Sequence, residues 1–370
     1  MNRWIFFVVV ISAFLVFGST EVLSEEGLSQ IEHLGKILYQ DKDLSYNSTQ
    51  SCKTCHHHVV GFADPTNSRD PYYTVVSTGA DGVSKGGRNA PSSAYSGYSP
   101  PLAWEANING YIGGMFWDGR ATGLSSSLSD PLAEQAQGPP LNLVEMNMPD
   151  KEAVVQAVRD STYTQLFYTV FGTGSLDDVN KAYDNIALAI AAYERSVEVQ
   201  QFNSRFDEGV LTNKEMHGMA LFSANCIKCH SITEGPNGEQ PLFTNYSYEN
   251  IGVPENPLLA GNPKDYGLGG FLESDYLSAT PQIGDAQYQL QYGKFKVPTL
   301  RNIVLTAPYA HNGFFPTLNS IVNFHNTRDV GNWSPPEISA NLNTDDVGDL
   351  GLTDEEVDDI IAFLTTLTDR

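Results

Sequence analysis

Apolar residues recur at helical spacing in three segments of the chain. The clearest is the C-terminal sequence LTDEEVDDIIAFLTTLTD, where one helical face carries Val357, Ile360, Ile361, Leu364 and Leu367. Thr353 and Glu356 have the spacing of a capping box, which predicts that this helix begins at Thr353. We expect two further helices, one over residues 181–197 and one over the sequence NKEMHGMALFSAN at 213–225.

Glycine, proline, asparagine and serine are frequent between these segments, as in GGRNAPSSAYSGYSPP and TEGPNGEQP. These residues favour turns and interrupt regular structure. We therefore predict a mainly α fold in which the helices are joined by long ordered loops, with very little strand.

The chain begins with MNRWIFFVVVISAFLVFGST, in which one basic residue precedes an apolar run from Trp4 to Phe17. This run is shorter than the ~20 residues that a membrane-spanning helix needs. We expect residues 1–24 to be a cleaved signal peptide that exports the protein to a bacterial periplasm. The alternative is an uncleaved N-terminal anchor.

The 370-residue chain has a formal net charge of -23. Nucleic-acid binding requires basic patches, so this charge argues against a nucleic-acid partner. An acidic surface suits a basic soluble partner, although it also simply aids solubility.

The cysteines of the chain fall into two C-x-x-C-H motifs, whose members are Cys52, Cys55, His56, Cys226, Cys229 and His230. A zinc site would bring the two pairs closer together and would need no histidine after each pair. Two disulfides remain an alternative, but they also leave both histidines unexplained. Covalent c-type haem accounts for all six residues, because the thiols add to the vinyl groups and the next imidazole binds the iron. We predict two such haems, with His56 and His230 as proximal ligands.

Five further motifs occur in order along the chain: GRNAP (87–91), FWDGRA (116–121), EQAQGP (134–139), VEMN (144–147) and VPTLRNIVLTAPYAHNG (297–313). In these motifs the chain resembles the bacterial di-haem cytochrome c peroxidases and their MauG-type relatives, over essentially the whole mature sequence. The resemblance implies two cytochrome c-like domains packed face to face. Residues 25–203 would hold the peroxidatic haem, and residues 204–370 would hold the electron-transfer haem.

The resemblance also implies roles for three side chains. Glu145 matches the distal carboxylate, and one carboxylate can take a proton from peroxide and return it to the leaving oxygen. Gln135 matches the distal amide, which would hold peroxide or water. Trp117 matches the indole between the two haems, where it would relay charge.

A calcium ion between the domains is a further implication of the resemblance. Its matching ligands are the side chain of Asn89 and the carbonyl oxygens of Thr306 and Pro308. Hard oxygen ligands supplemented by water suit this ion.

The chain departs from the classical peroxidases in the loop before GRNAP. Those enzymes carry there a distal histidine that blocks the catalytic iron until reduction moves it. In this chain the loop reads STGADGVSKGGRNAP, with Asp81 at the matching position and no histidine between Val59 and Val210. An open iron resembles the MauG-type enzymes and argues against a need for reductive activation.

The second haem needs a sixth ligand, and no methionine occurs after Met219. His311 belongs to the motif APYAHNG, where we expect a hydrogen bond to a propionate or at the calcium site. His325 lies nineteen residues after Thr306, the spacing at which the resemblance puts the family's methionine or tyrosine. We predict that His325 binds this iron; a tyrosine such as Tyr309, or no protein group, is the alternative.

These features together predict a periplasmic di-haem peroxidase that reduces hydrogen peroxide with electrons from a small cytochrome c or cupredoxin. One alternative is a MauG-like enzyme that oxidises tyrosine or tryptophan residues of a partner protein. Another is a non-enzymatic electron carrier. No stable membrane insertion is expected, and the resemblance includes homodimers among the assembly states.

Overall fold

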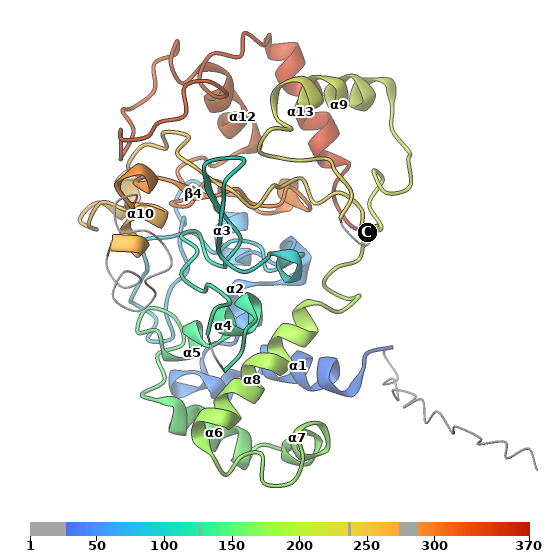
Figure 1. Ribbon diagram of the computed structural model, residues 1–370, viewed down its shortest axis with the longest axis vertical. Helices are drawn as coiled ribbons and strands as arrows, with labels where there is room; N and C mark the ends of the chain where they lie inside the picture. Colours follow the sequence, from blue (N-terminus) through green and yellow to red (C-terminus); the bar gives the residue numbers. More distant parts are fainter. Residues whose placement is uncertain (1–26, 126, 236–237, 274–287) are drawn as a thin grey trace, which may run out of the picture.

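The computed structural model describes residues 27–125, 127–235, 238–273 and 288–370, which form two helical halves lying one above the other in Figure 1. The signal peptide expected at residues 1–24 lies outside these residues. Within the described ranges, no helix combines the length and the apolar character that crossing a membrane requires.

Short and medium helices make up most of the regular structure. The N-terminal half contains α1 (Gln30–Gln40), α2 (Cys52–Cys55), α3 (Pro65–Arg69), α4 (Pro131–Ala136), α5 (Gly138–Leu141), α6 (Lys151–Asp160), α7 (Thr164–Phe171) and α8 (Val179–Glu194). The C-terminal half contains α9 (Asn213–Asn225), α10 (Gly267–Phe271), α12 (Leu318–Thr327) and α13 (Asp354–Thr365).

Each half is organised around one pair of packed helices: α1 against α8, and α9 against α13. At Gly35 of α1, a β-carbon would come within 1.9 Å of the carbonyl oxygen of Ala189 in α8. At Gly218 of α9, it would come within 1.8 Å of the carbonyl oxygen of Asp359 in α13. Only a residue without a β-carbon permits this approach, so both halves use the same packing device.

All three predicted helices are present. α9 spans the whole of NKEMHGMALFSAN, and α13 follows the predicted capping box of Thr353 and Glu356. The helix expected over residues 181–197 is α8, which begins and ends earlier than expected. It begins earlier because the side chain of Asp178 caps its first turn, accepting a hydrogen bond from the backbone nitrogen of Lys181 at 3.1 Å.

Strand in the described residues is confined to two short antiparallel pairs and isolated bridges. β1 (Ala103–Glu105) pairs with β2 (Gly110–Ile112), and β3 (Tyr248–Glu249) pairs with β4 (Phe295–Lys296). The prediction of a mainly helical fold with long loops and very little strand is confirmed.

Each half has its own apolar core, and a smaller cluster joins them. The N-terminal core surrounds α1 and α8. The C-terminal core is rich in aromatic rings, among them Phe222, Phe243, Phe315, Phe324 and Phe363. In the small cluster, two residues of the N-terminal half, Leu102 and Tyr111, pack with three residues of the C-terminal half. These three are Tyr248, Leu268 and Leu272. The two halves therefore meet through buried apolar contacts.

Two candidate haem sites

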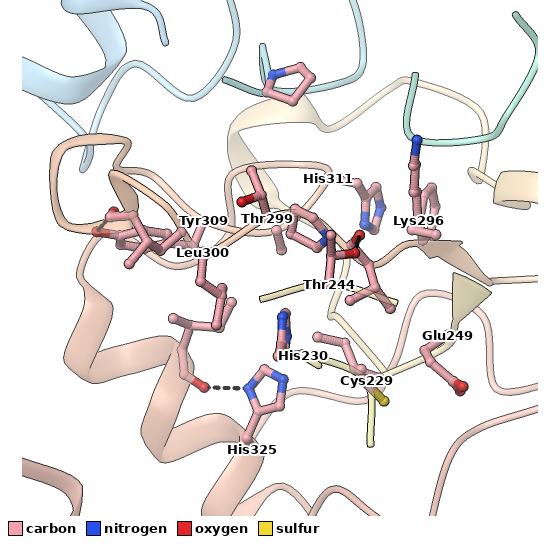
Figure 2. Close-up of a pocket in the computed structure, with 18 of the residues that line it drawn as sticks. Cys229, His230, Thr244, Glu249, Lys296, Thr299, Leu300, Tyr309, His311 and His325 are labelled. Carbon is pink, nitrogen blue, oxygen red and sulfur yellow. Dashed lines mark hydrogen bonds between the residues drawn. The ribbon is translucent and has the colours of Figure 1, made fainter. Parts of the chain in front are cut away.

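Each C-x-x-C-H motif opens onto a cavity. The N-terminal cavity has a volume of about 550 Å³ and is lined by the cysteines and the histidine of the motif at 52–56. The C-terminal cavity, of about 300 Å³, is lined by the same members of the motif at 226–230 (Figure 2). Both volumes lie within the ~300–1,000 Å³ typical of cofactor sites.

The imidazole of each motif is oriented by a backbone hydrogen bond. Nδ1 of His56 bonds to the carbonyl oxygen of Phe62 at 3.2 Å, and Nδ1 of His230 bonds to that of Phe243 at 2.8 Å. A proton on Nδ1 leaves the free electron pair on Nε2, as an iron ligand requires. Burial lowers the pKa of His56, and it lowers the pKa of His230 to about 4. Both rings are therefore neutral, which suits metal binding.

The cysteines of both motifs are free. Burial raises the pKa of Cys55, Cys226 and Cys229 to about 12, so these groups are protonated thiols. Thiol exchange begins from a thiolate, so buried thiols of this kind do not suit a redox pair. In the described ranges, no group of three or more histidine, cysteine or acidic side chains is arranged to hold a metal ion. The donor set therefore fits covalent attachment of a haem to each motif.

His325 enters the C-terminal cavity from α12. Figure 2 shows its ring next to that of His230, and its Nδ1 bonds to the carbonyl oxygen of Ile321 at 2.8 Å. This bond again leaves Nε2 as the acceptor. His311 instead lies in the wall between the cavities, stacked on Phe295 with ring centroids 3.5 Å apart. The geometry favours His325 over His311 as an iron ligand, and the ligation itself stays a prediction.

Glu145 and Gln135 line the N-terminal cavity together. Nδ2 of Asn142 donates a hydrogen bond of 2.6 Å to Oε1 of Glu145 and orients the carboxylate. Burial raises the pKa of Glu145, whereas the charge of Arg120 and the bond from Asn142 oppose that effect. The predicted carboxylate and amide thus share one cavity, and their catalytic roles remain predictions.

The loop before GRNAP presents no histidine to this cavity. Asp81 is exposed, and its carboxylate accepts hydrogen bonds from the backbone nitrogens of Val83 and Ser84 at 2.9 and 2.8 Å. Of the described residues that line the N-terminal cavity, only His56 and His311 are histidines. This loop therefore supplies no histidine that could act as a sixth ligand of the N-terminal haem iron.

Trp117 lies in the wall that the two cavities share. Its indole Nε1 donates to the backbone oxygen of Asn89 at 2.9 Å, and its own carbonyl oxygen accepts from the backbone nitrogen of Lys296 at 2.9 Å. The carboxylate of Glu134, which precedes Gln135 within α4, accepts hydrogen bonds from the backbone nitrogens of Thr122 and Gly123. Trp117 is therefore held from both halves, at the position expected between the two sites.

Comparison with known proteins agrees with this arrangement. Residues 29–215 match the family model described as di-haem cytochrome c peroxidase, and residues 216–368 match the model for cytochrome c. The chain belongs to the di-haem cytochrome c peroxidase family. This family consists of oxidoreductases with two c-type haems, so the predicted fold of two cytochrome c-like domains and the two predicted haems are confirmed.

Individual relatives cover nearly the whole of this di-haem protein. The methylamine utilization protein MauG of Paracoccus denitrificans is 40% identical over an alignment of 357 positions, which covers 91% of this chain and 88% of that protein. The cytochrome-c peroxidase IdrP1 of Denitromonas iodatirespirans is 30% identical over 90% of this chain and 80% of its own length. The solved structure of the diheme peroxidase BthA from Burkholderia thailandensis aligns with a TM-score of 0.77 at 27% identity, covering 95% of this chain and 87% of that one.

The three residues expected to bind calcium in this di-haem protein all line the C-terminal cavity. Asn89 is buried, and its Nδ2 donates to the carbonyl oxygen of Val75 at 3.0 Å, which leaves its side-chain oxygen as an acceptor. Thr306 and Pro308 line the same cavity, and the expected ligands from them are their backbone carbonyl oxygens. Neutral oxygens of this kind fit Ca²⁺.

Two further side chains that line the cavities, Arg120 in the N-terminal one and Lys296 in the C-terminal one, were not expected from the sequence. Arg120 stacks over the ring of Phe116, 3.9 Å from its centroid, and its Nη1 contacts the carboxylate of Asp118 at 3.0 and 3.1 Å. Its place in FWDGRA, next to Trp117, was a usable signal. Lys296 lines the C-terminal cavity. Nothing in the local sequence KFKVP indicates that its ammonium group contacts a loop far away in the chain.

Proposed function

We propose that this di-haem enzyme reduces hydrogen peroxide at its N-terminal haem site and works in the periplasm. One observation carries the proposal: Glu145 and Gln135 face the N-terminal cavity, and the described loop before GRNAP adds no histidine to it. A bound c-type haem supplies an iron centre that takes up peroxide and both of its oxidising equivalents.

Glu145 serves as the acid–base group of this reaction. Its carboxylate takes the proton from the peroxide oxygen nearest the iron and returns it to the leaving oxygen, which departs as water. Asn142 holds Oε1 of this carboxylate, so the other oxygen serves the substrate. The positive charge of Arg120 favours the ionised form that accepts the proton. Gln135 holds peroxide or water through its amide.

Trp117 relays charge between the two sites, because it lines both cavities. His230 and His325, which line the C-terminal cavity together, would hold the second iron. Two electrons and two protons complete each turnover, in which one hydrogen peroxide becomes two waters. The distal carboxylate has no use in a simple electron carrier, so catalysis is favoured over that alternative.

The source of the two electrons separates two activities. Electrons from a small cytochrome c or cupredoxin make the protein a detoxifying peroxidase. Electrons from tyrosine or tryptophan residues of a partner protein make it a MauG-like modifying enzyme. The 40% identity to MauG of Paracoccus denitrificans and the distal loop without a histidine favour the second activity as strongly as the first. The net charge of -23 suits a basic partner of either kind.

A calcium ion held by Asn89, Thr306 and Pro308 is part of this proposal. It would tie the GRNAP loop of the domain at 25–203 to the VPTLRNIVLTAPYAHNG motif of the domain at 204–370. A homodimer is the proposed assembly, by similarity to the family.

The test is turnover by the purified holoenzyme. Peroxide consumption is measured with a reduced small cytochrome, with a reduced cupredoxin and with candidate partner proteins, whose oxidised residues are located by mass spectrometry. Rapid consumption with a redox protein supports the peroxidase, and oxidation of specific partner residues supports the modifying enzyme. Peroxide left intact with every donor would refute both.

A further inference from the structure

The loop at residues 241–243, here called the proximal loop, carries the carbonyl group that orients His230. The carbonyl oxygen of Phe243 bonds to Nδ1 of His230 at 2.8 Å. The two preceding carbonyl oxygens of the loop accept hydrogen bonds from Arg301 Nε at 2.9 Å and from Thr299 Oγ1 at 2.6 Å. Three successive carbonyl groups are therefore each bound by a side chain, and the third of them holds the proposed iron ligand.

Arg301 is fully buried and rigidly held. Its two terminal nitrogens donate to the two carboxylate oxygens of Asp207 at 2.8 Å each, so its charge is paired. The guanidinium carbon lies 4.6 Å from the ring centroid of Phe202 and 5.9 Å from that of Phe243. A two-point pair with a carboxylate fixes the plane of a guanidinium. This pair therefore fixes the direction in which Nε of Arg301 donates to the proximal loop.

The backbone of the proximal loop needs this support at Phe243. Its φ is 55°, in the left-handed region that residues with a side chain rarely adopt. Such a conformation persists only where the surroundings fix it. Arg301 and Thr299 bind the two residues immediately before Phe243. Without these bonds the loop would relax toward an ordinary backbone and turn the Phe243 carbonyl away from His230.

The N-terminal motif is held differently. Phe62 has a similar φ of 60°, and its carbonyl oxygen bonds to Nδ1 of His56 at 3.2 Å. The same oxygen also accepts a hydrogen bond from the backbone nitrogen of Ser93 at 3.0 Å, so it is shared between two groups. The preceding carbonyl oxygen is bound by Ser92 Oγ at 2.6 Å, not by a cationic side chain. The shorter histidine bond, at His230, is the one with the arginine behind it.

We propose that Arg301 is a positioning residue that lowers the reduction potential of the C-terminal haem, because it fixes the carbonyl group that holds His230. A firm hydrogen bond from Nδ1 makes an imidazole a more basic ligand, which stabilises oxidised iron. The inference rests on the proposed function, in which the C-terminal site supplies an electron through Trp117. A lower potential makes that electron easier to remove.

The test measures the reduction potential of each haem by spectroelectrochemical titration of the holoenzyme, without peroxide. Arg301→Lys keeps the positive charge beside Asp207, but a single ammonium cannot replace the fork of a guanidinium that also binds the proximal loop. The potential of the C-terminal haem should rise. The electron paramagnetic resonance spectrum of its oxidised iron should shift as well, because the ligand field of His230 changes. The N-terminal haem should keep its potential and its spectrum.

Thr299→Val is a second variant, which removes the other side-chain bond to the proximal loop and leaves Arg301 in place. It should raise the same potential. Arg205→Lys is the matched control, because Arg205 also makes a two-point pair, with Glu215 at 2.7 Å, and donates no bond to the proximal loop in the described structure. Both haems should keep their potentials in this control.

An unchanged C-terminal potential in Arg301→Lys overturns the proposal, even where the melting temperature falls, because Arg301 would then have a packing role only. An equal shift at both haems also overturns it. If Arg301→Lys does not fold, Thr299→Val decides alone, and an unchanged potential in that variant refutes the proposal. No turnover is measured in these titrations, so a failure of the proposed peroxide reaction is seen separately.

Discussion

The indole Nε1 of Trp117 donates a hydrogen bond of 2.9 Å to the backbone oxygen of Asn89. The backbone nitrogen of Asn89 in turn donates to the carbonyl oxygen of His311 at 2.7 Å. This chain of bonds joins FWDGRA, GRNAP and APYAHNG in the wall between the two haem sites. The residue proposed to relay charge is therefore fixed by the residue proposed to bind calcium.

Trp117→Phe should slow charge transfer between the haems about tenfold or more. Phenylalanine keeps an aromatic ring in the wall, but it is much harder to oxidise than an indole and lacks the hydrogen bond to Asn89. Peroxide binding at the N-terminal haem should be unchanged, because Glu145 and Gln135 are retained. Stopped-flow spectra of the two haems measure both steps. Equal transfer rates in mutant and parent would leave Trp117 with a packing role only.

Glu145→Gln should lower the rate of O–O cleavage by ~10²–10⁴-fold, the usual contribution of a positioned acid–base group. The amide preserves the shape of the side chain, so both haems and the fold should be retained. Glu152→Gln, on the exposed face of α6, is the matched control and should leave the rate unchanged. A loss of less than about tenfold in Glu145→Gln would remove this carboxylate from the acid–base role.

The pH dependence of the same step follows from the pKa of Glu145. Burial raises this pKa, so on acidification the carboxylate is lost at a higher pH than an ordinary glutamate, and cleavage slows there. The charge of Arg120 opposes the effect of burial. Arg120→Gln should therefore move the acid limb of the pH–rate profile to still higher pH. An acid limb that stays in place would show that Arg120 does not act on Glu145.

His325→Ala should convert the C-terminal haem from low-spin to high-spin and leave its covalent attachment intact, because it removes the proposed sixth ligand. Electronic absorption and electron paramagnetic resonance spectra report the spin state. His217→Ala, at an exposed histidine of α9, should keep the parent spectrum. A low-spin spectrum that survives in His325→Ala would redirect the search to His311 and Tyr309.

Removal of calcium should slow inter-haem transfer while both haems stay attached. The proposed ion joins Asn89 to Thr306 and Pro308, so its loss would loosen the wall that holds Trp117. Elemental analysis should find one calcium per chain, and added Ca²⁺ should restore the rate after chelation. Asn89→Ala should weaken calcium binding. Protein that is fully active and free of calcium would refute this site.

The features that could be predicted from the sequence are those determined by residues a few positions apart in the chain. Haem attachment needs two cysteines and a histidine at a set separation, so Cys52, Cys55 and His56 were recognisable without a structure. A capping box followed by an apolar face likewise located α13. The bounds of α8 were less accurate, because its start depends on the cap from Asp178.

Contacts between distant segments could not be predicted in this way. The close approach of Gly35 to Ala189 follows from how two helices cross, and nothing in the local sequence of α1 encodes it. The ammonium of Lys296 meets Ser99 and Gly114 only because the two halves pack together. The side chains that position the candidate site were therefore found in the structure, whereas those that define its chemistry were found in motifs.

The central claim is that the N-terminal haem is open to peroxide in the oxidised enzyme. The most direct measurement mixes fully oxidised holoenzyme with one equivalent of hydrogen peroxide, without a reductant, and follows the Soret band. A high-spin component should be present at the start, and peroxide should change the spectra of both haems at once, because the loop with Asp81 supplies no histidine to the iron. An oxidised enzyme that is entirely low-spin, and that reacts with peroxide only after reduction, would contradict the account.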